Sequence, residues 1–241
     1  MKKIILILSV VLICFESVSA QTIKGLFDKV TKAGTSSSGS GLSNEDIISG
    51  LKDALRVGTD SSAKRLSKLN GFFGDAAIKV LMPEEAKKVE NTLRSFGMGP
   101  VVDKAILSMN RAAEDAASGV CNIFWEAIKK MSITDGLKIL RGGDFAATDY
   151  LKSITTLELT EKFRPVIEAS LVKVDATRYW KDMFTTYNRF SNKPVNTDLT
   201  AYVTERALRG LFLKISLEEQ KIRKNPAAQV TDILKRVFGG K

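Results

Sequence analysis

The chain contains no histidine, and this absence excludes more chemistry than any other feature of its 241 residues. Without an imidazole there is no Ser-His-Asp or Cys-His catalysis, no histidine proton shuttle and no metal site with a histidine ligand. The remaining acid–base chemistry rests on carboxylates, lysine, serine and tyrosine, or on carboxylate-bound Mg²⁺ or Ca²⁺. We predict neither a cofactor nor a metal site.

Cysteine is almost as scarce, occurring only as Cys14 and Cys121. Because Cys14 lies in a segment that we expect to be removed, one thiol remains and no disulfide can form within the mature chain. Apolar neighbours, Val120 on one side and Ile123-Phe124 on the other, predict a buried and unreactive Cys121. The mature protein must therefore be stabilised by its hydrophobic core.

Long apolar runs are also missing, since the longest covers residues 4–15 and a membrane-spanning helix needs about 20 apolar residues. Lys2 and Lys3 precede this run, and small residues follow it up to Ala20. This order is typical of a secretory signal peptide over residues 1–20, with Gln21 as the first mature residue. We therefore predict export to the periplasm or cell envelope.

Two alternatives to cleavage are disfavoured by the sequence of this segment. A retained membrane anchor is disfavoured by the short apolar run. Lipid attachment at Cys14 is disfavoured because Val11-Leu12-Ile13, rather than small residues, precede the thiol and because Cys14 lies inside the run.

The chain after residue 20 divides into a short helix, a linker and one large domain. Residues 21–34 carry Ile23, Leu26, Phe27 and Val30 at helical spacing, which predicts an amphipathic helix that docks on the domain or lies on a membrane surface. Residues 35–41 are serine, glycine and threonine and form a flexible linker. Residues 42–241 form the domain, which we expect to be helical throughout.

Sustained strand alternation is absent, so the predicted fold is all-α: a single globular bundle of roughly ten helices around a long central helix, with no β-sheet. The central helix is expected over residues 101–131, with a kink at Ser118-Gly119. Ser43 and Ser132, each three residues before an aspartate, are helix-start signals. The other expected helices are 60–69, 83–96, 144–154, one or two from 155 around Pro165, 179–190, 199–224 and 226–238.

Several separated segments resemble the bacterial domain-of-unknown-function 4197 family over about residues 41–239. The matching stretches are Gly41-Leu-Ser-Asn-Glu-Asp-Ile-Ile-Ser-Gly-Leu-Lys-Asp-Ala-Leu-Arg-Val-Gly58, Ser108-Met-Asn-Arg-Ala-Ala-Glu114, Gly142-Gly-Asp-Phe-Ala-Ala-Thr148, Ala207-Leu-Arg-Gly-Leu-Phe212, Ile222-Arg-Lys-Asn-Pro-Ala-Ala228 and Val237-Phe-Gly239. The resemblance implies an exported helical bacterial protein. It carries no activity or site residues with it.

Three polar residues are candidates for a binding site. Asn110 and Glu114 lie one turn apart at the border of the apolar stripe of their helix, where they could bind a polar ligand or form a hydrogen-bond network between helices. Asp144 follows a Gly-Gly turn and is interpreted as a helix cap or, alternatively, as a ligand. We assign no catalytic residue.

The net charge of +10 is the last feature that points to a partner. Basic residues gather near the C-terminus and predict a patch for anionic lipid or an acidic polymer, although ordinary solubilising charge explains them equally well. The predicted patch is Lys221, Arg223, Lys224, Lys235 and Arg236.

Together these features favour a non-enzymatic, envelope-associated binding protein whose partner is an envelope protein or an anionic surface. A hydrolase-type enzyme that uses carboxylate or lysine chemistry is the alternative. Export makes nucleic acid an unsuitable partner, and nothing in the sequence sets the oligomeric state.

Overall fold

The computed structural model describes residues 43–189, 192 and 194–225. Within these ranges the chain forms eight α-helices, one short 3₁₀ helix (η1) and no strand, which confirms the all-α fold. The predicted signal peptide, amphipathic helix, linker and C-terminal helix 226–238 lie outside the described residues. In chain order the elements are α2 (Asn44–Leu66), η1 (Glu84–Ala86), α3 (Lys87–Ser95), α4 (Gly99–Ala117), α5 (Cys121–Lys130), α6 (Ile133–Arg141), α7 (Ala146–Val172), α8 (Ala176–Asn188) and α9 (Leu199–Lys224).

Local capping signals place two helix starts where the sequence predicts them. The Ser43 side chain accepts from the Asp46 backbone N–H, and the Asp46 carboxylate accepts in return from Ser43. Ser132 and Asp135 make the same reciprocal pair at the start of α6. In both cases two backbone N–H groups that a helix leaves unpaired are satisfied.

Two predicted helix breaks are wrong because tertiary packing holds the helix through them. Gly58, which from the sequence alone is expected to end the first helix, does not end α2, because residues on both sides of it are buried: Leu51 and Ala54 before it, and Ala63 and Leu66 after it. A glycine inside a helix costs only about 1 kcal/mol, which packing overrides. Likewise Thr155 does not start a new helix, because its hydroxyl donates to the carbonyl of Leu151 within α7.

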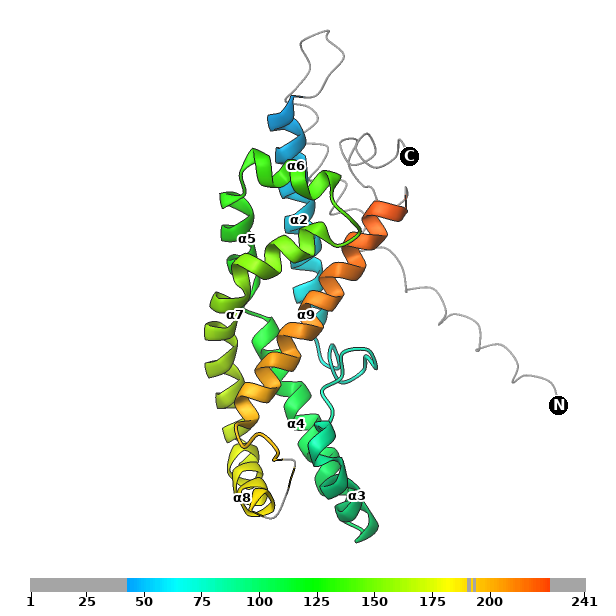
Figure 1. Cartoon of the computed structure of the whole chain (residues 1–241), viewed down its shortest axis with the longest axis vertical. Coiled ribbons are helices and arrows are strands. Elements are labelled where there is room, and N and C mark those ends of the chain that lie inside the picture. The colour runs from blue at the N-terminus through cyan, green and yellow to red at the C-terminus, as the bar shows by residue number, and fades with distance from the viewer. Residues whose placement is uncertain (1–42, 190–191, 193, 226–241) are drawn as a thin grey trace, which may run out of the picture. The chain divides into compact units, whose positions relative to one another are not determined.

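The prediction of one long central helix over residues 101–131 is also wrong, because the structure has two helices there, α4 and α5. The amides of Ser118 and Gly119 bond to carbonyls three residues back, and the Ser118 hydroxyl also donates to Asp115. This tightened turn ends α4, and α5 leaves in a new direction (Figure 1). Two mergers and one split, with the predicted helix 226–238 outside the described residues, leave eight α-helices in the described part of the chain instead of the predicted ten.

Helix α7 is the element that most other helices contact: α4, α5, α6, α8 and α9 all pack on it. Its buried residues recur every four positions, which is slightly more than one turn, so each lies about 40° around the helix from the last. Over the length of α7 this buried stripe turns through about 240°. Its members are Ala147, Leu151, Thr155, Leu159, Phe163, Ile167 and Leu171.

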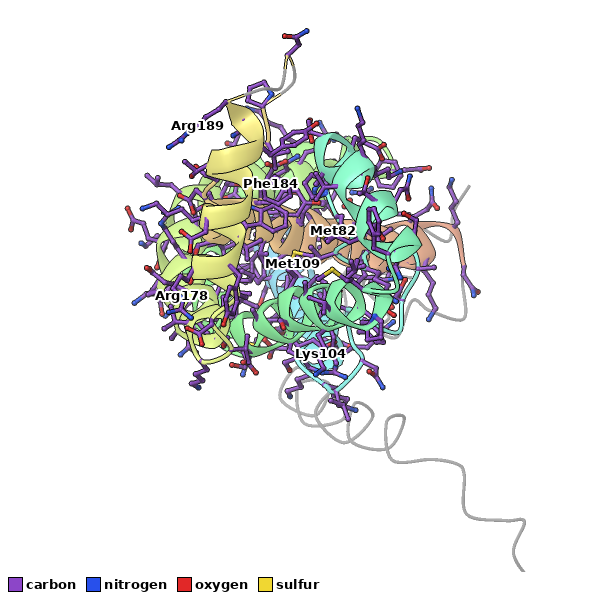
Figure 2. The ribbon with its side chains drawn as sticks, turned by 90° about the horizontal axis from the view of Figure 1, so that it is seen from below. Met82, Lys104, Met109, Arg178, Phe184 and Arg189 are labelled. Atoms are coloured by element: carbon purple, nitrogen blue, oxygen red, sulfur yellow. The ribbon has the colours of Figure 1, made fainter. Side chains whose placement is uncertain are left out.

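The main core lies where α4, α5, α7 and α9 meet, and α8 closes its lower end. Seen along the bundle, Met82, Met109 and Phe184 point inward, whereas Lys104, Arg178 and Arg189 point away from the core (Figure 2). A smaller cluster around Ile48, Met131 and Ile139 joins α2 to α6.

A charge placed in the main core should destabilise the domain. Ala113 on α4 is fully buried, so we expect Ala113→Asp to lower the free energy of unfolding by on the order of 3 kcal/mol. Ala169→Asp, on an exposed position of α7, is the matched control and should change it by about 0.5 kcal/mol or less. Equal melting temperatures for the two variants would contradict burial of this face.

Candidate functional site

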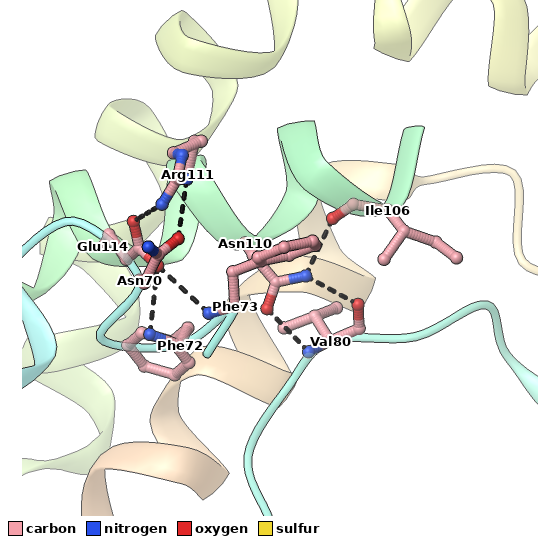
Figure 3. A network of polar contacts seen from close by, with 8 residues as sticks. All are labelled: Asn70, Phe72, Phe73, Val80, Ile106, Asn110, Arg111 and Glu114. Carbon is pink, nitrogen blue, oxygen red and sulfur yellow. Dashed lines mark hydrogen bonds and ion pairs between the residues drawn. The ribbon is translucent and has the colours of Figure 1, made fainter. Parts of the chain in front are cut away.

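Asn110 lies on α4 at a fully buried position, where its side chain forms hydrogen bonds with backbone groups of Val80 and Ile106. Its amide oxygen accepts from the Val80 N–H at 2.9 Å, and its amide nitrogen donates to the Val80 carbonyl at 2.8 Å and to the Ile106 carbonyl at 2.7 Å. The side chain therefore pairs with Val80 as a neighbouring strand would (Figure 3). The donors and the oxygen of this amide are all engaged within the chain.

Glu114, one turn further along α4, holds the same non-helical segment at a second point. One carboxylate oxygen accepts from the backbone N–H groups of Phe72 and Phe73 at 3.0 and 3.1 Å, and the other pairs with Arg111 (Figure 3). Arg111 also donates to Asn70 at 2.9 Å. Asp115, one turn after Arg111, accepts from the Ser170 hydroxyl.

The segment held in this way, residues 67–83, is wedged between α4 and α9. Its Phe72 ring lies against Gly210 of α9, where a β-carbon would come within 2.7 Å of the ring. Asn110 and Glu114 are thus close together, as their spacing predicts. Their partners are the backbone of this segment rather than another helix, and with these contacts both side chains fix a loop.

From the sequence alone, Glu218 and Glu219 are expected on a solvated helix face. This is wrong for Glu219 of α9, which makes the second buried carboxylate network. Its oxygens accept from the backbone N–H groups of Ala147 and Thr148 and from the Thr148 hydroxyl, each at 2.8 Å. A carboxylate at this place satisfies the free N–H groups of the first turn of α7 and complements its dipole.

Arg223, one turn after Glu219, completes the network at the other side of the Gly142-Gly143 turn. It pairs with Glu219 at 2.8 Å and donates to the carbonyl of Ile139 in the last turn of α6 at 2.7 Å. The end of α6 and the start of α7 thus receive a cation and an anion, respectively, from one helix. We call Glu219 and Arg223 the α9 clamp.

Asp144 does not cap α7, which corrects its interpretation as a helix cap. The cap position belongs to Phe145, and the Asp144 carboxylate pairs with Lys224 and accepts from Gln220. The hydrogen bond from Lys224 holds the pKa of Asp144 below its usual value. Because the folded-state pKa is the lower one, this stabilisation is present above the ordinary carboxyl pKa and disappears as the pH falls through the folded value. Asp144 therefore contacts the C-terminal part of α9, next to the α9 clamp, and does not lie with Asn110 and Glu114.

The predicted basic patch is divided by these contacts. Arg223 is used internally by the α9 clamp, and Lys224 pairs with Asp144. Lys221 is exposed, with Glu218 at 4.0 Å. Lys235 and Arg236 lie outside the described residues. A patch for an anionic surface therefore stays a prediction for three of the five residues: Lys221, Lys235 and Arg236.

A groove of about 790 Å³ lies between α7 and α9. Its floor is apolar and includes Leu208, Phe212 and Leu213 from α9, with Phe145 at one end. Threonines and charged residues of both signs form its edges: Thr148, Asp149, Lys152, Thr156, Thr160, Arg164, Thr204, Glu205 and Arg209. These residues share no feature that sequence reasoning could use, because the groove is made by two helices about 50 residues apart in the chain.

Cys121 is only half-buried, and its thiol lies near Asp60. Partial burial, followed by the hydrogen bond to Asp60, raises the pKa of this thiol. The thiolate fraction at pH 8 is then smaller than for a free cysteine, so we expect slower alkylation by iodoacetamide. Mass spectrometry over time should show this, and denaturant should restore the ordinary rate. Alkylation as fast in the folded as in the denatured protein would contradict it.

Neither a metal cluster nor a membrane span is found among the described residues. In those ranges no three Cys, Asp or Glu side chains are grouped to hold an ion. None of the helices that the structure describes is long and apolar enough to cross a bilayer.

Comparison with known proteins places the chain in one family. No curated protein and no solved structure matches it. Residues 41–239 match the family described as "Protein of unknown function (DUF4197)", and this range covers the whole described part of the chain. The chain therefore belongs to the DUF4197 family.

Proposed function

We propose that the protein is an exported, non-enzymatic binding protein of the cell envelope, and that the α7–α9 groove binds an amphipathic helix of a partner protein. The observation that carries this proposal is the groove itself, an open apolar channel with polar edges. Binding a helix in such a groove is a common way for proteins to recognise a partner segment.

The dimensions of the groove support a helical partner. On α7 it is lined at four-residue steps from Thr148 to Arg164, which corresponds to a length of about 24 Å, or four to five helical turns. Its volume divided by that length gives a mean cross-section of about 33 Å², less than half the area of about 79 Å² that a helix about 10 Å across occupies. The groove therefore suits one row of apolar side chains, with the partner helix lying on top.

Charge at the edges favours a protein over a lipid. Lys152 and Arg209 stand beside Asp149 and Glu205, and none of the four forms an ion pair with another described residue. Edges of mixed sign match a partner helix that carries both acidic and basic residues. A bilayer of anionic headgroups would be attracted by two of these side chains and repelled by the other two.

The buried carboxylates do not support the hydrolase alternative. Among the described residues the buried carboxylates are Glu114 and Glu219. Each is occupied by backbone N–H groups and an arginine, as described above. A general acid or base needs a carboxyl within reach of a substrate proton.

Site-specific photo-crosslinking in intact cells tests the groove. A photoreactive phenylalanine analogue at Leu213, in the groove, should give one discrete protein adduct, and the same analogue at Leu157 should give none, because Leu157 is exposed on α7 away from the groove. Peptide mapping should place the adduct in an amphipathic helix of the partner. Adducts at both positions or at neither would refute the groove, and lipid adducts would refute the partner class.

Export is tested separately by the mass of the mature protein. Cleavage after Ala20 predicts an N-terminus at Gln21 and no lipid. Intact-mass measurement of the envelope fraction should give this product. A diacylglycerol-modified Cys14, or an uncleaved chain, would contradict it.

A further inference from the structure

A second hollow, of about 290 Å³, lies where α8 and the start of α9 meet the chain just before α3. Its walls include Trp180 from α8, Tyr202 and Arg206 from α9, and Pro83 and Pro194 from the connecting segments. The hollow is at the lower limit of ligand sites, which range from about 300 to 1,000 Å³. It is of a size for a small molecule rather than for a helix.

Arg206 is the residue in this hollow that most needs a partner. Its Nε is buried and has no hydrogen bond, and no carboxylate of a described residue lies within ion-pair distance of its guanidinium. The group lies 5.2 Å from the centre of the Tyr202 ring, which favours a cation but does not replace an anion. The Arg206 side chain is half-buried and also contacts the Tyr202 hydroxyl, but its buried Nε keeps an unused donor, for which an anion is the matching acceptor.

The aromatic wall beside Arg206 is held rigidly before any ligand binds. Trp180 donates from its indole N–H to the Asn196 carbonyl at 2.8 Å, and the Tyr202 hydroxyl donates to the Leu81 carbonyl at 2.7 Å. The two rings are nearly parallel, 13° apart, with their centres 6.4 Å from each other. Such fixed walls lower the entropy cost of binding an apolar ligand group.

Two carboxylates narrow the class of anion. Glu85 and Glu205 also line the hollow. They repel a doubly charged anion such as phosphate, and they attract an ammonium group. A ligand that carries one carboxylate and one ammonium matches Arg206 and this acidic edge together.

We propose that this hollow binds a small zwitterion of the amino-acid type, with its carboxylate on Arg206, its ammonium towards Glu85 and Glu205, and an apolar side chain against Trp180 and the prolines. This proposal is independent of the partner in the α7–α9 groove, although Ala201 and Glu205 border both hollows. Arg206 and Glu85 border only the smaller one, so variants of these two residues separate the sites.

Calorimetric titration of the full chain with L-leucine and L-phenylalanine tests the proposal. We expect saturable binding of at least one of them, weakened at least tenfold when the carboxylate is converted to an amide or the amine is acetylated. Arg206→Gln should abolish it and Glu85→Gln should weaken it, whereas Arg178→Gln, on the outward face of α8, should not (Figure 2). Melting temperatures identify any variant that fails to fold. If Arg206→Gln does not fold, Glu85→Gln, at an exposed position, still tests the site.

Three results would overturn the proposal. The first is no saturable binding of either amino acid to the wild-type chain. The second is equal affinity in the wild type, Arg206→Gln and Glu85→Gln. The third is binding of inorganic phosphate as tight as that of the amino acid, because the hollow would then be a general anion site.

Discussion

Replacing Glu219 with alanine is expected to lower the free energy of unfolding by about 3–5 kcal/mol, the range found when one partner of a buried ion pair is removed. The substitution leaves Arg223 with its side chain 9% exposed and without its carboxylate. It also frees the backbone N–H groups of Ala147 and Thr148 at the start of α7. Urea unfolding followed by circular dichroism measures the change.

The neighbouring residue provides the control. Glu218 lies one position earlier on α9 and makes surface ion pairs with Arg65 and Lys221. Exposed pairs contribute about 0–1 kcal/mol, so Glu218→Ala should have a small effect. If both variants lost the same stability, the α9 clamp would have no special role and Glu219 would behave as a surface residue.

The second large effect is expected from Asn110→Asp, which keeps the shape of the side chain but changes its chemistry. At neutral pH the carboxylate cannot donate to the carbonyls of Val80 and Ile106, and it places a charge in a fully buried site. We expect a loss of about 3 kcal/mol or more in the free energy of unfolding. Asn122→Asp, on an exposed position of α5, is the matched control and should have little effect.

The pH dependence of this variant identifies the cause. Burial disfavours the charged form, so the introduced carboxyl has a higher pKa in the folded state than in the unfolded state. The free energy of unfolding that Asn110→Asp loses relative to the wild type should therefore become smaller as the pH falls below that raised pKa. A stability difference that is the same at pH 7 and pH 4.5 would show that charge burial is not the reason.

The features that the sequence predicted well are local ones. The bounds of α9, residues 199–224, agree with the prediction because its apolar stripe is regular and Asp198 before it caps the helix. The start of α6 at Ile133 follows from the capping pair Ser132 and Asp135, which needs four consecutive residues and nothing else. Such signals are complete within one helical turn.

The features that the sequence did not predict depend on residues far apart in the chain. Asn110 and Glu114 could be placed on one face of their helix, but their partners Val80 and Phe72 come from a segment that has no periodicity. Glu219 looked like a surface glutamate because the backbone that it binds is more than 70 residues away. One signal was available: Glu219 follows Leu208, Phe212 and Ile215 on the buried stripe of α9.

The turning stripe of α7 has a consequence for how the domain unfolds. Because the buried stripe turns around α7, several neighbouring helices cover it, and the loss of any one of them exposes part of this surface. Removing α9 exposes one side of α7, and removing α4 or α5 exposes another. The amides of α7 should therefore exchange with solvent hydrogen through the same global opening along most of its length, so that this helix joins the described helices into one cooperative unit.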